Sequence, residues 1–216
     1  MLKVSNLYKS FGEQTVLNDI SFELEKGEIM CLRGKSGAGK TTLIRCICNL
    51  EKADKGTISI DGIESLKNGK TNKEYQNMIG MVSQSLDLFP NMSVLDNITL
   101  APVSRKIMTK QQAEESALAL LDSLGIKHKS DAYPKNLSGG EKQRVAVARA
   151  CILSPSVLFF DEPTSALDIN STKEVAALIE SIAKRDIAVV IITHDEPFCK
   201  MLNAKEILIE KGKISK

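Results

Sequence analysis

A short glycine-rich stretch of the sequence, GKSGAGKT at residues 34–41, fits the pattern G-x-x-x-x-G-K-[ST]. Glycines let a backbone wrap a phosphate group so that its N–H groups point inward, and a helix that begins there adds a positive dipole. Lys40 would then reach the β and γ phosphates of a nucleotide, and the Thr41 hydroxyl would bind Mg²⁺. The stretch predicts a phosphate site; a glycine turn that only caps a helix is the alternative.

Two carboxylates, Asp161 and Glu162, follow directly after the apolar run VLFF at 157–160. Ligands bind outside the carboxyl ends of strands in open α/β sheets, so both side chains would lie beside the phosphates. Asp161 would hold the Mg²⁺ from the side opposite Thr41, and Glu162 would polarise the attacking water as a general base. Taken alone, the pair could equally be a helix cap or a solvated turn.

His194 and Gln84 also follow apolar runs, IAVVII at 187–192 and IGMV at 79–82. His194 could hydrogen-bond the γ-phosphate, which is the phosphate that distinguishes ATP from ADP. Gln84 carries an amide that can contact the metal or the water. Each of the two would be an ordinary surface residue if it stood alone.

A second glycine pair lies much later in the chain, in LSGGEKQR at 137–144. Ser138 and Glu141 have the spacing of a capping box at the start of a helix. The N–H groups at a helix N-terminus form an anion site, so this stretch predicts a second phosphate site. One nucleotide has one set of phosphates, however, and the first stretch already accounts for it.

The elements that must position these residues alternate between strands and helices. The first thirty residues form short alternating runs, which predict an antiparallel sheet with exposed faces. Strands that alternate with helices favour a mostly parallel sheet for the rest of the core. The expected buried strands are 29–33, 79–82, 157–160, 187–192 and 206–210, with a further short strand in 56–63, and the expected helices are 41–50 and 171–185.

A block of helices interrupts this alternation between about residues 90 and 154. Thr109 and Gln112 form a capping box before one helix, and a second helix runs from Ser138 towards Ser154. We therefore expect an α/β fold with an N-terminal antiparallel β subdomain and an inserted all-helical subdomain. Within a single domain of residues 1–216, the expected ranges are about 1–85 and 155–216 for the catalytic core and about 86–154 for the helical subdomain.

The composition narrows the classes of protein that the chain could be. Its 216 residues are 43% hydrophobic, which suffices for one domain with a sizeable core. The formal net charge of +2 is too small to indicate a nucleic-acid partner. The longest apolar runs are strand-sized and the five cysteines include no CxxC pair, so we expect no secretion signal, membrane span, disulfide or cysteine metal site.

The motifs, in their order along the chain, resemble those of the ATP-binding-cassette (ABC) transporter ATPases. GKSGAGKT, Gln84, LSGGE, VLFFDE, SALD at 165–168 and His194 match the Walker A, Q-loop, signature, Walker B, D-loop and H-loop of that family. The resemblance covers essentially the whole chain and implies a P-loop NTPase core that hydrolyses ATP with Mg²⁺.

The same resemblance implies which residues form the site. The catalytic group would be Glu162, His194, Gln84 and Lys40, and the Mg²⁺ ligands would be Thr41, Gln84 and Asp161. ATP would be bound by Phe11, which would stack on adenine, and by Gly34, Lys35, Ser36, Gly37, Ala38, Gly39, Lys40, Thr41 and Thr42.

In that family two nucleotide-binding domains meet head to tail, and each ATP lies between the P-loop of one and the signature of the other. Because the chain has one copy of each motif, the resemblance implies a homodimer. The residues that would contact the ATP of the second copy are Ser138, Gly139, Gly140 and Asp168.

Two further segments, DEPTSALD and AYPKNLSGG, are most similar to the polar amino-acid uptake ATPases. Such ATPases work with separate transmembrane permease subunits and an extracytoplasmic binding protein. Residues 84–101 would contact the permease. The resemblance therefore implies a cytoplasmic protein, peripheral on the inner face of the cell membrane, with no nucleic-acid partner.

Some features leave alternatives open. Lys35 replaces the proline usual in the P-loop, and Glu141 replaces the glutamine frequent in the amino-acid group; only the second departure weakens the substrate assignment. The lipoprotein-releasing and peptide-exporting ABC ATPases, which are also short, are an alternative. A soluble ABC protein of DNA repair or translation would usually carry coiled-coil, zinc-binding or tandem-cassette insertions, and none appears. A nucleotide sensor without turnover would not need both Glu162 and His194.

Overall fold

The computed structural model describes residues 1–165 and 167–215 and divides the chain into two compact units. Unit 1 comprises Met1–Ile79 and Ser156–Lys216, and unit 2 comprises Gly80–Pro155. The sequence suggested a first division near residue 85. The structure has it after Ile79, at the first residue of strand β8 (Ile79–Val82), which therefore carries the chain from one unit into the other.

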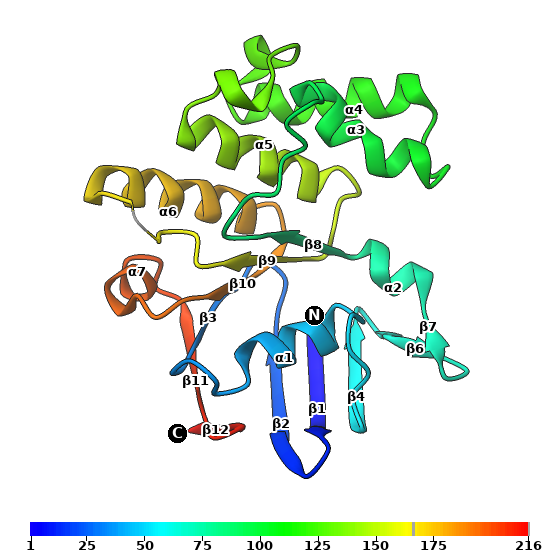
Figure 1. Ribbon diagram of the computed structural model, residues 1–216, viewed down its shortest axis with the longest axis vertical. Coiled ribbons are helices and arrows are strands. Elements are labelled where there is room, and N and C mark those ends of the chain that lie inside the picture. The colour runs from blue at the N-terminus through cyan, green and yellow to red at the C-terminus, as the bar shows by residue number, and fades with distance from the viewer. Residues whose placement is uncertain (166, 216) are drawn as a thin grey trace. The chain divides into compact units, whose positions relative to one another are not determined.

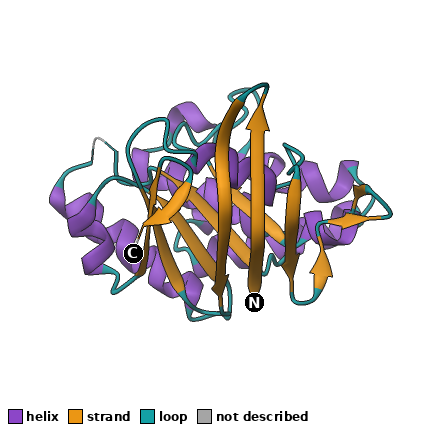
Figure 2. Cartoon of the chain, turned by 90° about the horizontal axis from the view of Figure 1, so that it is seen from below, coloured by secondary structure: helices purple, strands orange, loops and turns teal. Residues whose placement is uncertain are grey.

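An antiparallel sheet is built from the first part of the chain, as the alternating sequence predicts (Figure 1). Its order is β2-β1-β4-β5, with β1 (Leu2–Phe11), β2 (Gln14–Leu24), β4 (Lys55–Ile60) and β5 (Ile63–Glu64). Figure 2 shows the long strands β1 and β2 side by side, with the N-terminus at the start of β1. Leu2 and Val4 are buried while Lys3 between them is exposed, because successive side chains of a strand point to opposite faces.

The second sheet contains the strands that lead to the predicted site. Its order is β12-β11-β3-β10-β9-β8, with β3 (Ile29–Arg33), β9 (Val157–Asp161), β10 (Ala188–Ile192), β11 (Lys205–Glu210) and β12 (Lys213–Ser215). Strands β11, β3, β10 and β9 are parallel, and β12 pairs with β11 as an antiparallel hairpin. The mostly parallel core expected from the sequence is confirmed.

The register of this sheet brings three strand ends together. Ile192, the last residue of β10, lies opposite Leu32 of β3 on one side and Asp161 of β9 on the other. The residues that follow these strands therefore leave the sheet at the same carboxyl edge, where α/β sheets bind ligands.

The helices of unit 1 are α1 (Lys40–Ile47), α2 (Lys73–Asn77), α6 (Ile169–Ala183) and α7 (Glu196–Met201). Leu43, Ile44 and Ile47 form the buried face of α1, and the buried Tyr75 donates a hydrogen bond of 2.7 Å to the carbonyl of Ile47. The short α2 and α7, and the small hairpin of β6 (Leu66–Lys67) and β7 (Lys70–Thr71), were not predicted, because elements of so few residues carry little periodicity.

The core of unit 1 is one cluster of apolar side chains from both sheets and α1. Leu7 and Leu17 of the antiparallel sheet, Leu43 of α1 and Phe159 of β9 are all fully buried. Each such side chain contributes about 1.5–3 kcal/mol of transfer free energy to folding. The core thereby fixes α1 and β9 within one body, and these are the elements that carry the glycine-rich loop and the two carboxylates.

Unit 2 is helical, as expected, with α3 (Val94–Ser104), α4 (Lys110–Ser123), α5 (Gly139–Cys151) and two short 3-10 turns, Lys127–Lys129 and Pro134–Asn136. The capping boxes predicted at Thr109 and Ser138 are both present. Helix α5 ends at Cys151 and does not reach Ser154, because Ser154 adopts a left-handed φ of 51° that a helix cannot continue. Helix α3, which lies within the block expected to be helical, is capped by Ser93.

Candidate active site

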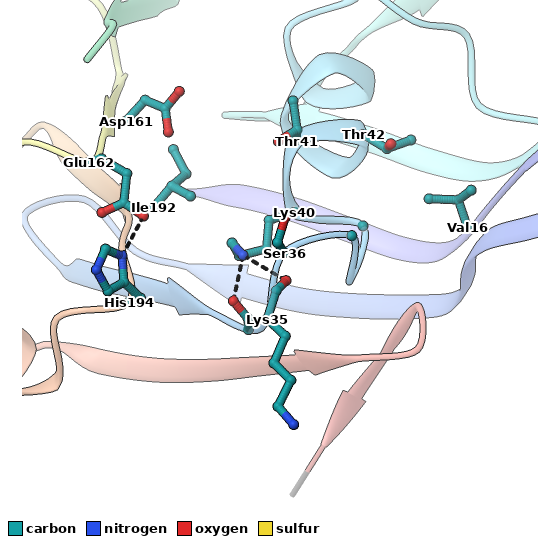
Figure 3. Close-up of a pocket in the computed structure, with 13 residues that line it drawn as sticks. Val16, Lys35, Ser36, Lys40, Thr41, Thr42, Asp161, Glu162, Ile192 and His194 are labelled. Carbon is teal, nitrogen blue, oxygen red and sulfur yellow. Dashed lines mark hydrogen bonds and ion pairs between the residues drawn. The ribbon is translucent and has the colours of Figure 1, made fainter.

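A cavity of about 480 Å³ lies in unit 1 where the glycine-rich loop faces the ends of β9 and β10 (Figure 3). This volume is in the ordinary range for small-molecule sites. Its walls are Val16, Gly34, Lys35, Ser36, Gly37, Gly39, Lys40, Thr41, Thr42, Asp161, Glu162, Ile192 and His194. The structure therefore brings together most of the residues that the sequence predicts for one site, from segments far apart in the chain.

The glycine-rich loop has a backbone that only glycine adopts without strain. Gly34 has a φ of 150°, and a Cβ there would clash with the carbonyl oxygen of Ile209. Gly39 has a φ of 107°, and a Cβ there would lie 2.8 Å from the carbonyl oxygen of Val16. Gly39 also precedes α1 and has no side chain to cap the helix. The N-terminus of α1 consequently faces the cavity as an anion site.

Lys40 is folded over this loop. Its Nζ donates hydrogen bonds to the carbonyl of Gly34 at 2.5 Å and to the carbonyl of Lys35 at 3.1 Å (Figure 3). These bonds hold the ammonium group at the wall of the cavity, where phosphate oxygens could replace the two carbonyls. The side chain of Lys35 points the other way, out of the cavity.

Asp161 lies on the opposite wall, and its charge is poorly compensated. Burial raises the pKa of the Asp161 carboxyl above its ordinary value, and the neighbouring Glu162 adds to this, while Lys40 acts in the opposite direction. A desolvated carboxylate beside a second one favours a bound cation. Among the described residues no three His, Cys, Asp or Glu side chains form a metal cluster. A cation beside Asp161 would take further oxygen ligands from Thr41 and from a phosphate group.

Glu162 is held in a strained and well-defined position. Its φ of 47° is left-handed, a conformation that costs a non-glycine residue about 1–3 kcal/mol. Its N–H donates a hydrogen bond of 2.8 Å to the carbonyl of Ile192. Its carboxylate accepts a hydrogen bond of 3.2 Å from the Thr193 hydroxyl and lies 3.0 Å from Nδ1 of His194. Three contacts from the end of β10 thus aim this carboxylate.

His194 is mostly exposed, with 79% of its side-chain surface accessible, whereas Glu162 retains 21%. The hydrogen bond with Glu162 raises the pKa of His194 above its ordinary value, and the charge of Glu162 adds to the shift. The ring is thus attached to Glu162 at the mouth of the cavity (Figure 3). It remains accessible to a ligand that enters.

Thr193 and Val16 belong to this site although the sequence interpretation missed them. Thr193 is fully buried, and its hydroxyl donates to Glu162 while it accepts from the N–H of Asp195 at 3.0 Å. A hydroxyl at the end of an otherwise apolar strand was the available signal. Val16 of β2 lines the cavity, but an apolar residue in a β strand gives no signal of this kind.

Other predicted residues lie outside the cavity. Phe11 is 49% exposed, and the Nζ of Lys9 lies 4.8 Å from the centre of its ring, so its contact with adenine stays a prediction. Ala38 does not line the cavity. Asp168 caps α6 by accepting hydrogen bonds from the N–H groups of Asn170 and Ser171 at 2.8 and 3.0 Å. Ala166 of the SALD segment lies outside the described residues.

The remaining predicted residues, Gln84, Ser138, Gly139 and Gly140, belong to unit 2. Ser138 begins α5 through its capping box with Glu141. Two contacts lower the pKa of the Glu141 carboxyl, first the N–H of Ser138 and then the ammonium of Lys129, which lies 3.2 Å away. A Cβ added at Gly139 or Gly140 would meet nothing within 4 Å. The start of α5 is therefore an open, internally neutralised helix N-terminus.

A glycine-rich loop before a helix, with a lysine folded over it, faces a desolvated aspartate and a glutamate held by the end of β10. This arrangement is the one expected of a P-loop nucleoside triphosphatase. The comparisons with known proteins give the family within this class. The model of the family described as ABC transporter matches residues 17–165. The chain therefore belongs to the ABC transporter family, as an ATP-hydrolysing, ATP-binding subunit.

Similar curated proteins cover almost the whole chain. The glutamate transport ATP-binding protein GluA of Corynebacterium glutamicum is 41% identical over 99% of this chain and 88% of its own length. The arginine transport protein ArtM and the glutamine transport protein GlnQ, both ATP-binding proteins of Bacillus subtilis, are each 42% identical over 99% of this chain, with 89% and 88% of their own lengths covered.

Solved structures agree in fold over the full length. The protein cbiO1 from Clostridium perfringens, part of the ABC transporter complex cbiONQ, superposes with a TM-score of 0.89 at 27% identity, covering 100% of this chain and 86% of that one. A dimeric post-hydrolysis state of the cassette MJ0796, bound to ADP and Pi, gives a TM-score of 0.80 at 28% identity, covering 100% and 97%. None of the described helices is long and apolar enough to cross a membrane.

Proposed function

We propose that the chain powers the import of polar amino acids, as a homodimer that binds two ATP molecules and works with separate membrane subunits. The three relatives named for glutamate, arginine and glutamine transport support the substrate class. The observation that carries the catalytic role is the position of Glu162, which β10 aims at the cavity through the backbone of Ile192 and the side chains of Thr193 and His194.

In the proposed mechanism the phosphate chain of ATP binds along residues 34–42, and Lys40 exchanges its two carbonyl partners for phosphate oxygens. Asp161 and Thr41 would hold Mg²⁺, whose charge would offset that of the phosphates. His194 turns from Glu162 to the γ-phosphate. The oxygen Oε1 of Glu162 is then free to accept the proton of the attacking water. Gln84 would supply an amide oxygen for the metal or the water.

The second copy completes each site in this proposal. Ser138, Gly139 and Gly140 of one protomer approach the γ-phosphate bound by the other, and Asp168 crosses between the two. The exposed N-terminus of α5 suits an anion that the same chain does not bind there. The dimeric structures of a similar cassette, with TM-scores of 0.80 and 0.81, support this arrangement.

A surface of unit 2 suits a membrane subunit at the inner face of the cell membrane. Arg149 donates hydrogen bonds of 2.7 Å to the carbonyls of Leu86 and Asp87, which both have a left-handed φ. This contact fixes a loop that exposes 44% of Phe89. Exposed apolar groups on a fixed loop favour protein contacts, so we assign residues 84–101 as the permease-binding segment.

The decisive experiment on catalysis is the Glu162→Gln variant, with Glu180→Gln on the exposed side of α6 as the matched control. Glutamine keeps the shape of the side chain but cannot accept the proton, so we expect turnover to fall by about 10²–10⁴-fold. ATP binding should persist, and the variant should form an ATP-bound dimer that elutes earlier in size exclusion. Hydrolysis at the wild-type rate would show that Glu162 is not the base.

The proposed transport role is tested with the permease that co-purifies with the tagged chain. In proteoliposomes that contain both, ATP hydrolysis should depend on the permease and rise when a binding protein loaded with glutamate, glutamine or arginine is added. Stimulation by none of these, together with release of a lipoprotein or a peptide, would favour the exporting alternative.

A further inference from the structure

We propose that Arg33 is a positioning residue that fixes His194 relative to the phosphate loop through its ion pair with Glu196. The inference rests on the proposed role of His194 at the γ-phosphate. The side chain of Arg33 does not line the cavity; it acts through the first turn of α7.

The geometry joins two points of the site. Arg33 is the last residue of β3 and directly precedes Gly34 of the phosphate loop. Its Nη2 lies 2.9 Å from Oε2 of Glu196, and its Nη1 lies 2.6 Å from Oε2 of Glu206. Glu196 is the first residue of α7 and follows His194 by two positions. One guanidinium group therefore joins the root of the phosphate loop to the segment that carries the histidine.

That segment has weak backbone attachment to β3. The regular pairing of β10 with β3 ends at Ile192, opposite Leu32. The next bond, from the N–H of Thr193 to the carbonyl of Leu32, has a length of 3.4 Å, well beyond the usual N–H···O distance of about 2.9–3.0 Å. The ion pair of Arg33 with Glu196 connects the end of β3 to the segment after β10, beyond the last regular backbone hydrogen bond between the two strands.

The rest of α7 is anchored elsewhere. Phe198 and Cys199 are buried and hold the middle of the helix. Asp195 caps the helix by accepting from the N–H of Phe198 at 3.0 Å. These contacts fix the axis of α7, whereas Arg33 acts on its first residue, which is the end next to His194.

The two glutamates that Arg33 contacts differ in how far their position depends on the ion pair. Glu206 lies within β11, directly opposite Cys31 in the backbone ladder with β3, so its strand stays in place without the ion pair. Glu196 has no such ladder. Glu196 also pairs with Lys200 one helical turn away, at 2.6 Å, but Lys200 belongs to the same helix and cannot hold α7 against β3.

The test compares the ATPase kinetics of Glu196→Gln with two matched controls, Glu206→Gln and Lys200→Gln. Arg33 and Glu196 expose 25% and 45% of their side chains, and partly exposed ion pairs contribute at most about 1 kcal/mol. We therefore expect a fall in kcat of about two- to fivefold in Glu196→Gln, with an unchanged KM for ATP. Both controls should retain the wild-type kcat, and equal losses in all three variants would overturn the proposal.

Salt gives a readout that a general loss of structure would not change. At about 1 M salt the Debye length falls to about 3 Å, so the pair is largely screened in the wild type too. The ratio of wild-type to Glu196→Gln kcat should approach one as KCl rises from 0.05 to about 1 M. A ratio that stays constant would contradict an electrostatic contact.

The His194→Ala variant separates this inference from the function on which it rests. If Arg33 acts through His194, Glu196→Gln should cause no further loss in the His194→Ala background. If His194→Ala hydrolyses ATP at the wild-type rate, the proposed role of His194 is wrong. If His194→Ala loses activity and Glu196→Gln does not, only the positioning role of Arg33 is wrong.

Discussion

Two helices of this protein begin at glycines, and the reasons for glycine differ. At the start of α1, Gly39 has a φ of 107° and lies against the backbone of Val16. At the start of α5, Gly139 and Gly140 have helical backbones, and an added Cβ would meet nothing within 4 Å. The fold itself requires the first glycine. Nothing among the described residues requires the other two, and a bare backbone there would suit the proposed approach of a phosphate group bound by the second copy.

The same contrast holds for the carboxylates beside these helices. Near α5, Glu141 is neutralised within the chain by Lys129 and by the N–H of Ser138. Near α1, Asp161 is partly buried with Glu162 as a neighbour, and its pKa is raised. The charge at the first end is thus only partly offset, by Lys40, and the proposed Mg²⁺ would offset it further. The second is complete as a helix terminus and open as a contact surface.

The largest effect is expected from Gly39→Ala. A side chain there combines a left-handed backbone with a close backbone contact, which should lower the free energy of unfolding by about 2–4 kcal/mol. ATP binding should be lost because α1 begins directly after this residue. Thermal denaturation and nucleotide titration measure both. Gly37→Ala is the control for the loop, since an added Cβ meets no atom within 4 Å there despite the φ of 78°, so its loss of stability should be smaller.

Gly139→Ala should separate stability from activity. Alanine is the better helix former by up to about 1 kcal/mol, so the free energy of unfolding should stay the same or rise slightly. Hydrolysis should fall by about a hundredfold, which is typical when one contact to a developing charge is lost, and ATP-driven dimerisation should fall with it. Normal ATP hydrolysis by this variant would show that no phosphate group of the second copy lies close to the N-terminus of α5.

A smaller effect concerns the melting temperature of the nucleotide-free protein, which the carboxylates of Asp161 and Glu141 should change in opposite directions. Asp161 has a raised pKa, so its ionisation costs stability as the pH rises through that value, and Asp161→Asn should raise the melting temperature at pH 7. Glu141 has a lowered pKa, so its contribution is present above its ordinary pKa of about 4.3 and is lost as the pH falls through the lowered value. Glu141→Gln should therefore lower the melting temperature at pH 7, and a shift of the same sign in both variants would refute the contrast.

The smallest effect concerns the pH dependence of the pair of His194 and Glu162. The pair raises the pKa of His194, so its stabilisation is fully present below the ordinary histidine pKa of about 6.5 and is lost as the pH rises through the raised value. Chemical denaturation should show that His194→Ala is less stable than the wild type at pH 6 and that the difference shrinks by pH 9. His128→Ala is the control for loss of a histidine elsewhere.

The sequence predicted the parts of this protein whose chemistry is local. The strands around the site were predictable from apolar runs bounded by glycine or by charged residues, and the capping boxes of α4 and α5 were predictable because two residues three positions apart define them. Motif spacing, together with the rule that ligands bind at strand ends, predicted the cavity walls formed by residues 34–37 and 39–42, Asp161, Glu162 and His194.

The parts that depend on contacts across the fold were not predictable. Thr193 orients Glu162 only because β10 lies next to β9. Glycine is needed at position 39 because the carbonyl oxygen of Val16, in the antiparallel sheet, lies close to it. The ion pairs of Arg33 join residues more than 160 positions apart. A single residue carries no sequence signal of such distant partners. The position of the site was therefore predictable, whereas the residues that hold its side chains in place were not.

The capping box at Ser138 also determines what kind of ligand its hydroxyl can recognise. The oxygen of that hydroxyl accepts a hydrogen bond from the N–H of Glu141 at 3.3 Å, so one of its lone pairs is directed back into the helix. The hydroxyl hydrogen keeps its rotational freedom and can point outward, alongside the first N–H groups of α5. Ser138 thus presents donors in preference to acceptors. In the proposed dimer, this polarity would favour the phosphate oxygens of the second copy's nucleotide over a cation.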